Sequence, residues 1–383
     1  MKLAFCLFEY FPYGGLQRDF LRIAKLCLQK GHQIDVYTMQ WTGDKPNLEQ
    51  CNIHIIEMPK IFKHSTNHNK ALQFSNKLQN IFLQEKYDLT FGFNKIPGLD
   101  LYYCADSCYV AKVDSQKTKL IKLFYKLTAR FRQFKYLEHS VFANQKTKIL
   151  FLSDQEKNNY QQYYHTPDDL CYLLPPNINK SRFEPITDQQ TKLNIKQELS
   201  KLLNIPINTY WLLMVGSGFR TKGVDRSITL LKYLAEKNIV ANLIIIGQDD
   251  PSAFLKLAKK LGVQNYIKIL PGRDDIAKFM AVADVLLHPA YRENTGTVIL
   301  ESIIMGLPVI ASGICGYSHH ISDSGCGLVI QEPFNQNIFN TNMYKLLEDD
   351  NLRAGMSGKG LEYRNIADIY NSDDKILELI ECQ

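Results

Sequence analysis

Short apolar runs alternate with longer stretches of helical periodicity along the whole chain. In the first half, the runs of strand character are residues 3–8, 33–38, 53–57, 89–93 and 149–152. Helical patterns separate these runs, and the pattern at residues 17–29 ends just before Gly31, a residue type that commonly terminates helices.

The second half repeats this alternation. Its strand-like runs are residues 211–215, 243–246, 267–270, 284–288 and 308–311. Helical patterns at residues 225–237 and 252–261 lie between them. Strand–helix alternation is typical of parallel sheets with right-handed crossovers, so we predict one such sheet in each half.

The 383 residues are too many for one ordinary core and suit two domains. The stretch Leu174-Pro175-Pro176-Asn177 marks the predicted boundary. We therefore predict an α/β fold with two Rossmann-like domains, 1–176 and 177–365, facing across a cleft where ligands of such sheets bind. Residues 366–383 predict a terminal helix whose docking partner the sequence does not identify.

Composition narrows the class of protein. The chain is 45% hydrophobic, and no apolar run approaches the about 18–20 residues of a transmembrane helix. The N-terminal run predicts a first strand rather than a signal peptide. The nine cysteines are dispersed without a C-x-x-C motif, which indicates free thiols in a reducing cytoplasm and disfavours a zinc site.

Positive charge is concentrated in one segment, within the range 111–140. Residues 111–150 hold ten Lys and Arg against two acids, Asp114 and Glu138, whereas the net charge of the whole chain is only +6. On one helix, an apolar stripe would form from Leu120, Leu123, Phe124, Leu127, Phe131 and Phe134. Basic residues flank that stripe at Lys119, Lys122, Lys126 and Arg130.

An apolar stripe bordered by Lys and Arg predicts an interfacial helix, over about residues 112–135, on an anionic membrane surface. Two alternatives are a core-packed helix with a basic solvent face and a nucleic-acid patch. Nucleic acid is disfavoured because the rest of the chain offers no further basic surface.

Two glycine-containing loops follow predicted strands. In "EYFPYGGLQRDF", residues 9–20, Gly14 and Gly15 lead directly into a helix, but the third glycine of a dinucleotide fingerprint is missing. In "VGSGFRTKG", residues 215–223, Arg220 and Lys222 are placed to meet a diphosphate. The alternatives are an ordinary tight turn and a solvated loop.

Two carboxylates flank a predicted helix start near residue 297. Glu293 precedes the helix and Glu301 lies within it. Ionised carboxylates accept charge-assisted hydrogen bonds from sugar hydroxyls, while glycine loops and cations suit a diphosphate. The combination predicts a nucleotide-sugar site; the alternatives are a surface carboxylate that caps the helix, for Glu293, and an exposed helix residue, for Glu301.

The stretch "YRENTGTVILE" resembles the E-x7-E motif of retaining GT-B enzymes of glycosyltransferase family 4. "FPYGGLQRDFLRIA", "HSTNHNK", "GFNKIPGLDLYYCAD", "LLPPNI", "KGVDRSI", "GQDDP", "LLHPAYRE" and "CGYSHHI" extend the resemblance from residue 11 to about residue 321. It implies transfer of glucose from UDP-glucose to a heptose of the lipopolysaccharide inner core. Alternatives are another UDP-sugar or glycolipid acceptor, a UDP-sugar 2-epimerase of the same fold, and a catalytically idle membrane scaffold.

The resemblance also implies roles in binding the donor diphosphate. Gly14 and Gly15 would lie against it, and Asp19 would line the cleft beside them. Lys222 would neutralise the diphosphate, with Arg182 nearby.

At one position the chain departs from the family pattern. Related enzymes carry Arg directly before the lysine equivalent to Lys222, whereas here Thr221 stands there and Arg220 is one place upstream. Lys222 is therefore the firmer expectation, and Arg220 is a further candidate for binding the phosphates.

Other roles implied by the resemblance concern the base, the sugars and the phosphates. Arg273 would sit in the loop that holds the uracil through backbone contacts. Glu293 would bind hydroxyls of the transferred sugar, and Glu301 those of the ribose. Gly296 and Thr297 would offer backbone amides to the phosphates.

The resemblance also makes Asp106, which ends "LYYCAD", the candidate for contacting the acceptor or assisting its deprotonation; the alternative is a structural helix N-cap. The catalytic set is then Glu293, Asp106 and Lys222. The chain contains no Asp-x-Asp pair, so we expect a metal-independent enzyme without a cofactor. The resemblance implies front-side attack, in which the departing phosphate takes the acceptor proton. The implied location is cytoplasmic and peripheral, on the inner face of the inner membrane.

The histidines give weaker signals. His64, His68, His288, His319 and His320 show no metal-like pairing in the sequence. We interpret His288 as a packed residue at a strand end, and His68 as a residue that could touch the acceptor.

Overall fold

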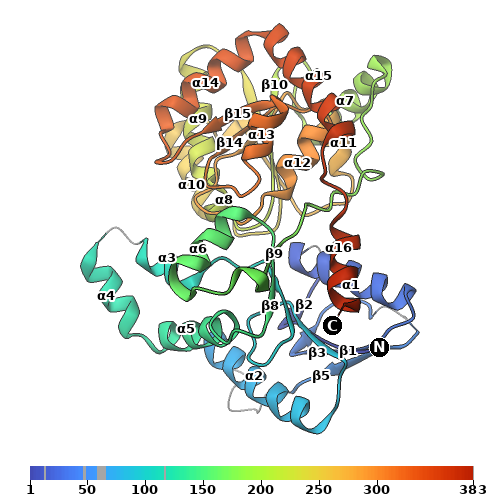
Figure 1. Ribbon diagram of the computed structural model, residues 1–383. Helices are drawn as coiled ribbons and strands as arrows, with labels where there is room; N and C mark the ends of the chain where they lie inside the picture. Colours follow the sequence, from blue (N-terminus) through green and yellow to red (C-terminus); the bar gives the residue numbers. More distant parts are fainter. Residues whose placement is uncertain (13, 46–48, 58–65, 116–117, 383) are drawn as a thin grey trace. The chain divides into compact units, whose positions relative to one another are not determined.

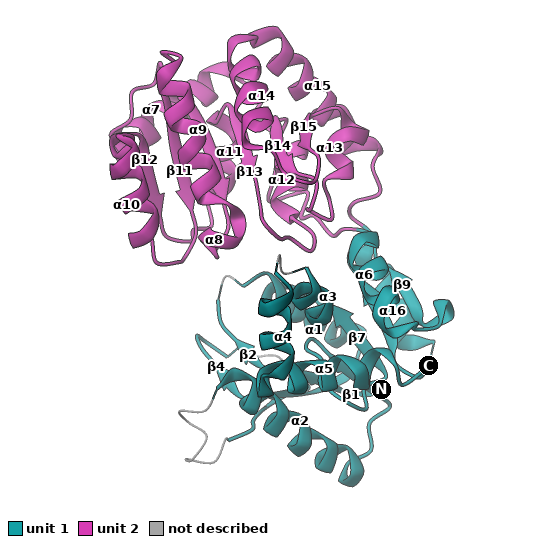
Figure 2. Ribbon diagram, turned by 90° about the vertical axis from the view of Figure 1, so that its left-hand side faces the viewer, with its two compact units in different colours: residues 1–175, 371–383 teal, residues 176–370 magenta. Residues whose placement is uncertain are grey.

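The computed structural model describes residues 1–383 except 13, 46–48, 58–65, 116–117 and 383. His64 and residues 116–117 of the basic segment therefore lie outside the described residues. The chain forms two compact units: residues 1–175 with 371–383, and residues 176–370 (Figure 2).

The N-terminal unit is built on a parallel sheet. Among the described residues it has seven strands in the order β5-β3-β1-β6-β7-β8-β9 (Figure 1). They are β1 (Lys2–Cys6), β3 (Gln33–Thr38), β5 (Cys51–Ile55), β6 (Leu89–Gly92), β7 (Leu101–Cys104), β8 (Lys148–Phe151) and β9 (Cys171–Leu173). A small parallel pair is formed by β2 (Glu9–Tyr10) and β4 (Gln40–Trp41).

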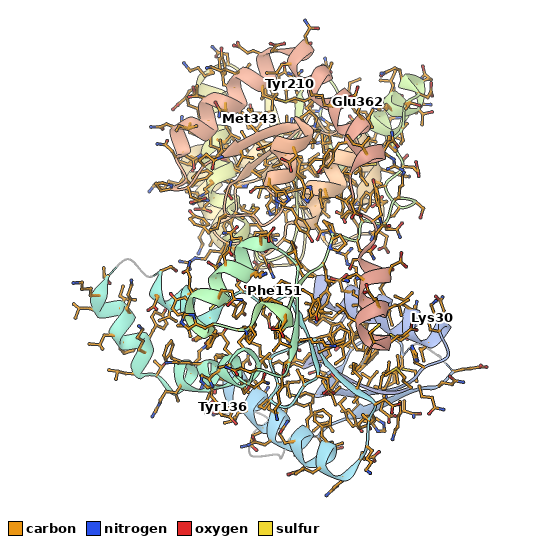
Figure 3. All side chains as sticks on the ribbon, in the orientation of Figure 1. Lys30, Tyr136, Phe151, Tyr210, Met343 and Glu362 are labelled. Carbon is orange, nitrogen blue, oxygen red and sulfur yellow. The ribbon has the colours of Figure 1, made fainter. Side chains whose placement is uncertain are left out.

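Helices connect the strands of this sheet. They are α1 (Gly15–Gln29), α2 (Asn67–Gln84), α3 (Tyr109–Asp114), α4 (Lys119–Leu127), α5 (Ala129–Phe142) and α6 (Asp154–Tyr164). Buried rings, among them Phe5, Phe20, Phe91 and Phe93, pack edge-on and tilted between β1, β6 and α1. Side chains fill the unit densely, with Phe151 inside it and Tyr136 at its surface (Figure 3).

The second unit repeats the architecture. Its described strands form a parallel sheet in the order β12-β11-β10-β13-β14-β15. They are β10 (Tyr210–Val215), β11 (Ala241–Ile246), β12 (Ile267–Leu270), β13 (Val285–His288), β14 (Val309–Ser312) and β15 (Gly327–Ile330). In both sheets the strand order reverses beside the first strand of the unit, β1 or β10, as in a Rossmann fold.

The helices of the second unit follow from its apolar spacing. They are α7 (Gln189–Leu203), α8 (Phe219–Lys222), α9 (Val224–Glu236), α10 (Ser252–Leu261), α11 (Ile276–Val282), α12 (Thr297–Ile304), α13 (His319–Ser324), α14 (Gln336–Glu348) and α15 (Asp350–Ile366). In α9, for example, Ile228, Leu231 and Leu234 recur at helical spacing and are buried. All six residues of β11 are buried, as expected for a strand covered on both faces.

The last helix, α16 (Ser372–Glu381), belongs to the N-terminal unit. Ile376 and Ile380 are fully buried and share a core with residues of β1 and α1. Arg22 of α1 forms an ion pair with Asp373. The helix that the sequence left without a partner therefore packs on the first unit of the chain.

The basic segment differs from the single helix predicted for it. Thr128 has extended backbone, with ψ of 148°, and its hydroxyl caps α5 by accepting a hydrogen bond from the Phe131 amide. The chain thus bends between α4 and α5, and Phe131 is buried instead of continuing the exposed stripe. The prediction of one continuous stripe was wrong because the local cap starts a second helix.

Helix α4 itself is exposed along its length. None of its residues is buried, and Leu120, Phe124 and Leu127 are 81%, 69% and 71% exposed. It lies at the rim of its unit, away from the sheet (Figure 1). Across the described part of the chain, every helix is too short or too polar to span a bilayer.

Candidate active site

A carboxylate, an ammonium group and an imidazole meet at the carboxyl end of the second sheet. His288 ends β13, Lys222 ends α8 just after β10, and Glu293 follows β13 in the loop that precedes α12. Because β10 and β13 are neighbours in the parallel sheet, the loops that follow them lie at the same edge. This topology brings together residues that are 71 positions apart in the chain.

The contacts within this cluster involve one of the two oxygens of the Glu293 carboxylate. Lys222 Nζ and His288 Nε2 both contact Glu293 Oε2, the latter at 3.0 Å. For the other oxygen, Oε1, no partner is found among the described residues. The Glu293 side chain is 13% exposed, so this oxygen is held in a sheltered position and retains its capacity to accept hydrogen bonds.

Protonation states follow from these contacts. Burial alone would raise the pKa of Glu293, but the His288 hydrogen bond and the Lys222 charge outweigh it and lower this pKa to about 2. Burial lowers the pKa of His288. At neutral pH we therefore assign an ionised Glu293 that accepts a hydrogen bond from the Nε2–H of a neutral His288.

Helix α12 begins beside this cluster. Gly296 is its N-cap residue, with φ of +86°, and no side chain among the described residues caps the helix. A Cβ at Gly296 would lie 3.0 Å from Ile299 Cδ1 and 3.3 Å from Glu293 Cγ, so glycine serves both the backbone angle and the close packing. The first turn, which starts at Thr297, thus has the features of an anion-binding helix N-terminus.

The structure also decides between the alternatives for the two glutamates. Glu293 does not cap α12, because the N-cap is Gly296 and lacks a side-chain cap. Glu301 is 8% exposed and takes part in interactions, so it is not a free surface residue of the helix. The alternatives, a capping surface carboxylate for Glu293 and an exposed helix residue for Glu301, were therefore wrong.

An arginine that the sequence analysis missed anchors the loop carrying Glu293. Arg226 donates to the carbonyls of Pro289 and Ala290 at 2.9 and 3.0 Å. Its guanidinium stacks 3.7 Å from the ring centroids of both Tyr291 and Phe334. In the sequence, the only indication of Arg226 was its place in "KGVDRSI". The two rings that enclose its guanidinium come from segments far apart in the chain, so the sequence does not show this contact.

Backbone contacts complete that anchor. The Tyr291 amide donates to the Thr221 carbonyl at 2.8 Å. Gly223, with φ of +76°, approaches Pro289 so closely that a Cβ there would collide with the Pro289 carbonyl oxygen. The loop after β10 and the loop after β13 are therefore fixed to each other.

The other predicted cations of this unit differ in availability. Arg220 is exposed and forms no ion pair within the described residues. Arg182 approaches the carbonyl and carboxylate of Asp274 at 3.4 and 3.8 Å. Arg273 binds Asp275 through two nitrogens, so its guanidinium already has a carboxylate partner.

The predicted residues of the N-terminal unit lie on loops and the first helix. Gly14 is the N-cap of α1 and Gly15 its first residue, again without a capping side chain among the described residues. Asp19 accepts from Tyr103 Oη at 3.0 Å and from Arg22 at 3.3 Å. Asp106 is exposed in the loop between β7 and α3.

A pocket of about 230 Å³ that the sequence did not predict lies beside α1 in this unit. Its polar wall includes Asn67, Lys70 and Asn94. Asn94 Oδ1 accepts from the Phe8 amide at 2.7 Å, which fixes the orientation of its side chain. The pocket adjoins the ends of β1, β3 and β6, where ligands of parallel sheets bind.

The histidines considered in the sequence analysis have different surroundings in the structure. His288, interpreted as a packed residue, is 1% exposed but also bonds to Glu293. His319, His320 and Asp323 place potential metal-ligand atoms within 4.8 Å of one another, the one such group of three among the described residues. His68 Nε2 lies 3.1 Å from Thr66 Oγ1.

The comparison with known proteins adds the family. The family model for glycosyl transferases group 1 matches residues 195–362. The lipopolysaccharide glucosyltransferase WaaG of Escherichia coli (strain K12) is 40% identical over 384 residues, which cover 99% of this chain and 98% of WaaG.

Solved structures agree with this assignment. The crystal structure of WaaG, a glycosyltransferase involved in lipopolysaccharide biosynthesis, is similar with a TM-score of 0.89, 38% identity and 99% coverage of both chains. Sucrose-phosphate synthase from Thermosynechococcus elongatus, at 15% identity and a TM-score of 0.75, covers 100% of this chain and 98% of its own, and shares the fold alone. The chain thus belongs to the group 1 glycosyl transferases and is a glycosyltransferase with the GT-B fold.

Proposed function

We propose that the protein is a retaining, metal-independent glucosyltransferase that moves glucose from UDP-glucose to a heptose of the lipopolysaccharide inner core. The observation that carries the proposal is the Glu293–Lys222–His288 cluster beside the uncapped start of α12. The 40% identity with a lipopolysaccharide glucosyltransferase over nearly the whole chain supports the choice of sugar and acceptor.

On the donor side, the cluster suits a sugar diphosphate. The free Oε1 of Glu293 would accept from hydroxyls of the glucose, while the buried Glu301 would bind the ribose. Lys222 has three ammonium hydrogens and gives one to Glu293, so it can still donate to a phosphate oxygen. The amides at Gly296 and Thr297 would meet the same diphosphate.

The charge of the departing UDP would be stabilised by Lys222 and by the positive end of α12. In the front-side course implied by the family resemblance, the bond from the sugar carbon to the phosphate oxygen breaks as the acceptor oxygen attacks the same face. The departing phosphate then takes the acceptor proton. Arg220, exposed and without an ion pair in the described part of the chain, would add to the stabilisation.

In the N-terminal unit, Asp106 would contact the acceptor. The pocket lined by Asn67, Lys70 and Asn94 also includes Glu9, and its polar groups next to apolar walls are a combination suited to a sugar ring. Gly14, Gly15 and Asp19 keep their proposed places near the donor diphosphate.

Residence on the cytoplasmic face of the inner membrane is part of the proposal. Exposed Leu120, Leu123, Phe124 and Leu127 stand beside Lys119 and Lys122 on α4. Apolar side chains of this kind bury in the headgroup region while lysines meet anionic lipid. Lys126 contributes less, because it pairs with Asp114 at 2.7 Å.

The test is UDP release from a panel of UDP-sugars with purified lipopolysaccharide core acceptor, with and without EDTA. We expect acceptor-dependent turnover of UDP-glucose, unaffected by EDTA and lost in Glu293→Gln but retained in Glu236→Gln, a glutamate with an exposed side chain on α9. Turnover of another donor would remove the glucose assignment. UDP-sugar epimerisation without acceptor would overturn the transferase proposal.

Membrane binding is tested separately by co-sedimentation with vesicles. We expect binding to vesicles containing anionic phosphatidylglycerol and weaker binding to neutral phosphatidylcholine vesicles. Leu123→Gln with Phe124→Gln should reduce the binding, whereas Leu202→Gln, an exposed leucine of α7, should not. Equal binding by both variants would contradict the role of α4.

A further inference from the structure

A fully buried carboxylate stands at the centre of the N-terminal unit. Glu138 of α5 is 0% exposed and pairs with Lys95 at 2.7 Å. Its oxygens also accept from the amides of Tyr109 and Val110, at 2.5 and 3.2 Å, and from Tyr164 Oη at 2.9 Å. Burying such a pair carries a large desolvation cost, so its presence calls for a reason beyond stability.

The neighbours of Glu138 all reach one short stretch of backbone. Tyr160 Oη donates to the Asp106 carbonyl at 2.9 Å, and Lys95 Nζ donates to the Ser107 carbonyl at 3.2 Å. The Cys108 amide donates to Glu156 Oε2 at 3.1 Å. Together with the two amides on Glu138, buried side chains bond a backbone group of each residue from 106 to 110.

Of the five residues in this stretch, one is exposed to solvent. Asp106 is exposed, whereas Tyr160 is fully buried and stacks on Phe142 at 3.9 Å. An exposed carboxylate on an immobilised backbone is the arrangement expected of a group that must meet a ligand at a fixed place. A loop with a purely structural role would not need the polar side chains of three buried residues and of the largely enclosed Lys95.

We propose that Tyr160, Lys95 and Glu138 are positioning residues that hold Asp106 in place for the acceptor. The inference rests on the proposed transferase function and adds the residues through which Asp106 is fixed. Tyr160 makes the direct bond to the Asp106 carbonyl, and the Lys95–Glu138 pair fixes the residues on its C-terminal side.

The structure offers a matched pair of variants on α6. Tyr160→Phe and Tyr164→Phe each remove one buried hydroxyl that bonds to Glu138, at 3.5 and 2.9 Å. Of the two hydroxyls, that of Tyr160 also bonds to Asp106. We expect Tyr160→Phe to lower kcat about 5- to 10-fold with little change in the affinity for UDP, and Tyr164→Phe to keep kcat within about twofold.

A double-variant cycle tells positioning from general damage. Asp106→Asn should lower kcat by about 100-fold or more, and Tyr160→Phe should then cause no further loss in the Asp106→Asn background. If Tyr160→Phe does not fold, Lys95→Arg replaces it, because it keeps the charge opposite Glu138 and changes the bond to Ser107.

Each result is decisive. The positioning role is overturned by an equal loss in Tyr160→Phe and Tyr164→Phe, by an additive loss in the double variant, or by an unchanged kcat in Asp106→Asn. In each of these cases, turnover by the wild-type protein would still support the proposed transferase function. Absence of acceptor-dependent turnover in the wild-type protein overturns the proposed function, and the positioning role falls with it.

Discussion

Each unit contains a largely enclosed glutamate paired with a lysine, and the two carboxylates differ in exposure and in hydrogen bonding. Glu138 is completely enclosed, and both of its oxygens accept from neighbouring groups. Glu293 is 13% exposed and has both assigned partners on the same oxygen. A saturated carboxylate can only hold structure, whereas one with an unused oxygen can also bind a ligand.

The residues around the two pairs also differ in which groups they hold in place. Around Glu138, side chains from several segments converge on the backbone of residues 106–110. Around Glu293, Arg226 and Gly223 fix the backbone of the loop and leave the side chain facing the start of α12. The two glutamates thus differ both in exposure and in how completely their oxygens are hydrogen-bonded.

Removing Glu138 should have the largest effect on stability. Glu138→Ala leaves Lys95 buried without a carboxylate, and we expect a loss of about 3–5 kcal/mol in the free energy of unfolding. Hydrogen exchange of peptides from α5 and α6 would localise the loss to the N-terminal unit. Glu85→Ala, which breaks the exposed Lys2–Glu85 pair, should cost less than about 1 kcal/mol; equal losses would contradict the comparison.

Removing the charge of Glu293 should act on activity. Glu293→Gln keeps the shape but weakens the acceptance of sugar hydroxyls, and we expect kcat/KM to fall roughly 100- to 1000-fold, about 3–4 kcal/mol. UDP release measured under saturating acceptor would show it. Retention of more than a tenth of wild-type activity would assign Glu293 to support rather than to binding.

The pH dependence of stability should sharpen the contrast. The folded pKa of Glu293, about 2, lies below its usual 4.5, so its ionised form stabilises the protein above about pH 4.5 and this contribution is lost as the pH falls toward 2. The contribution is at most about 3.4 kcal/mol.

The measurement is urea denaturation at pH 7, 4 and 3. The chain has two tryptophans, so Trp211 of β10 reports on the second unit alone when Trp41 is replaced by Phe. Between pH 7 and pH 3, the free energy of unfolding should fall more in the wild-type protein than in the Glu293→Gln variant. Parallel curves for the two proteins would mean that Glu293 is not held in its ionised form by Lys222 and His288.

The smallest effect is expected at His288. His288→Leu removes the hydrogen bond to Glu293 Oε2 and should lower kcat about 5- to 10-fold by loosening the carboxylate. His288→Gln, which retains a nitrogen donor, should recover most of the rate. Similar rates for both variants would show that packing at the end of β13 matters rather than the bond.

Much of the fold could be predicted from the pattern of residues. All ten predicted strand runs overlap observed strands, and the parallel sheets are confirmed. In the two main sheets the sequence analysis missed β7, β9 and β15, which are three or four residues long, because short apolar runs lack a distinct period. The break at Thr128 was missed because the apolar spacing continues through it while a side-chain cap interrupts the backbone.

The sequence by itself determined the strand–helix alternation, the family resemblance and the candidates Glu293, Lys222 and Asp106. The alternation, Glu293 and Lys222 follow from local spacing and residue type, whereas Asp106 follows from the family resemblance. Only the tertiary structure decided that His288 and Lys222 share one oxygen of Glu293, that Arg226 is sandwiched between two rings, and that α16 returns to the first unit. These contacts join segments far apart in the chain, so they depend on how parallel strands are ordered, which residue spacing does not encode.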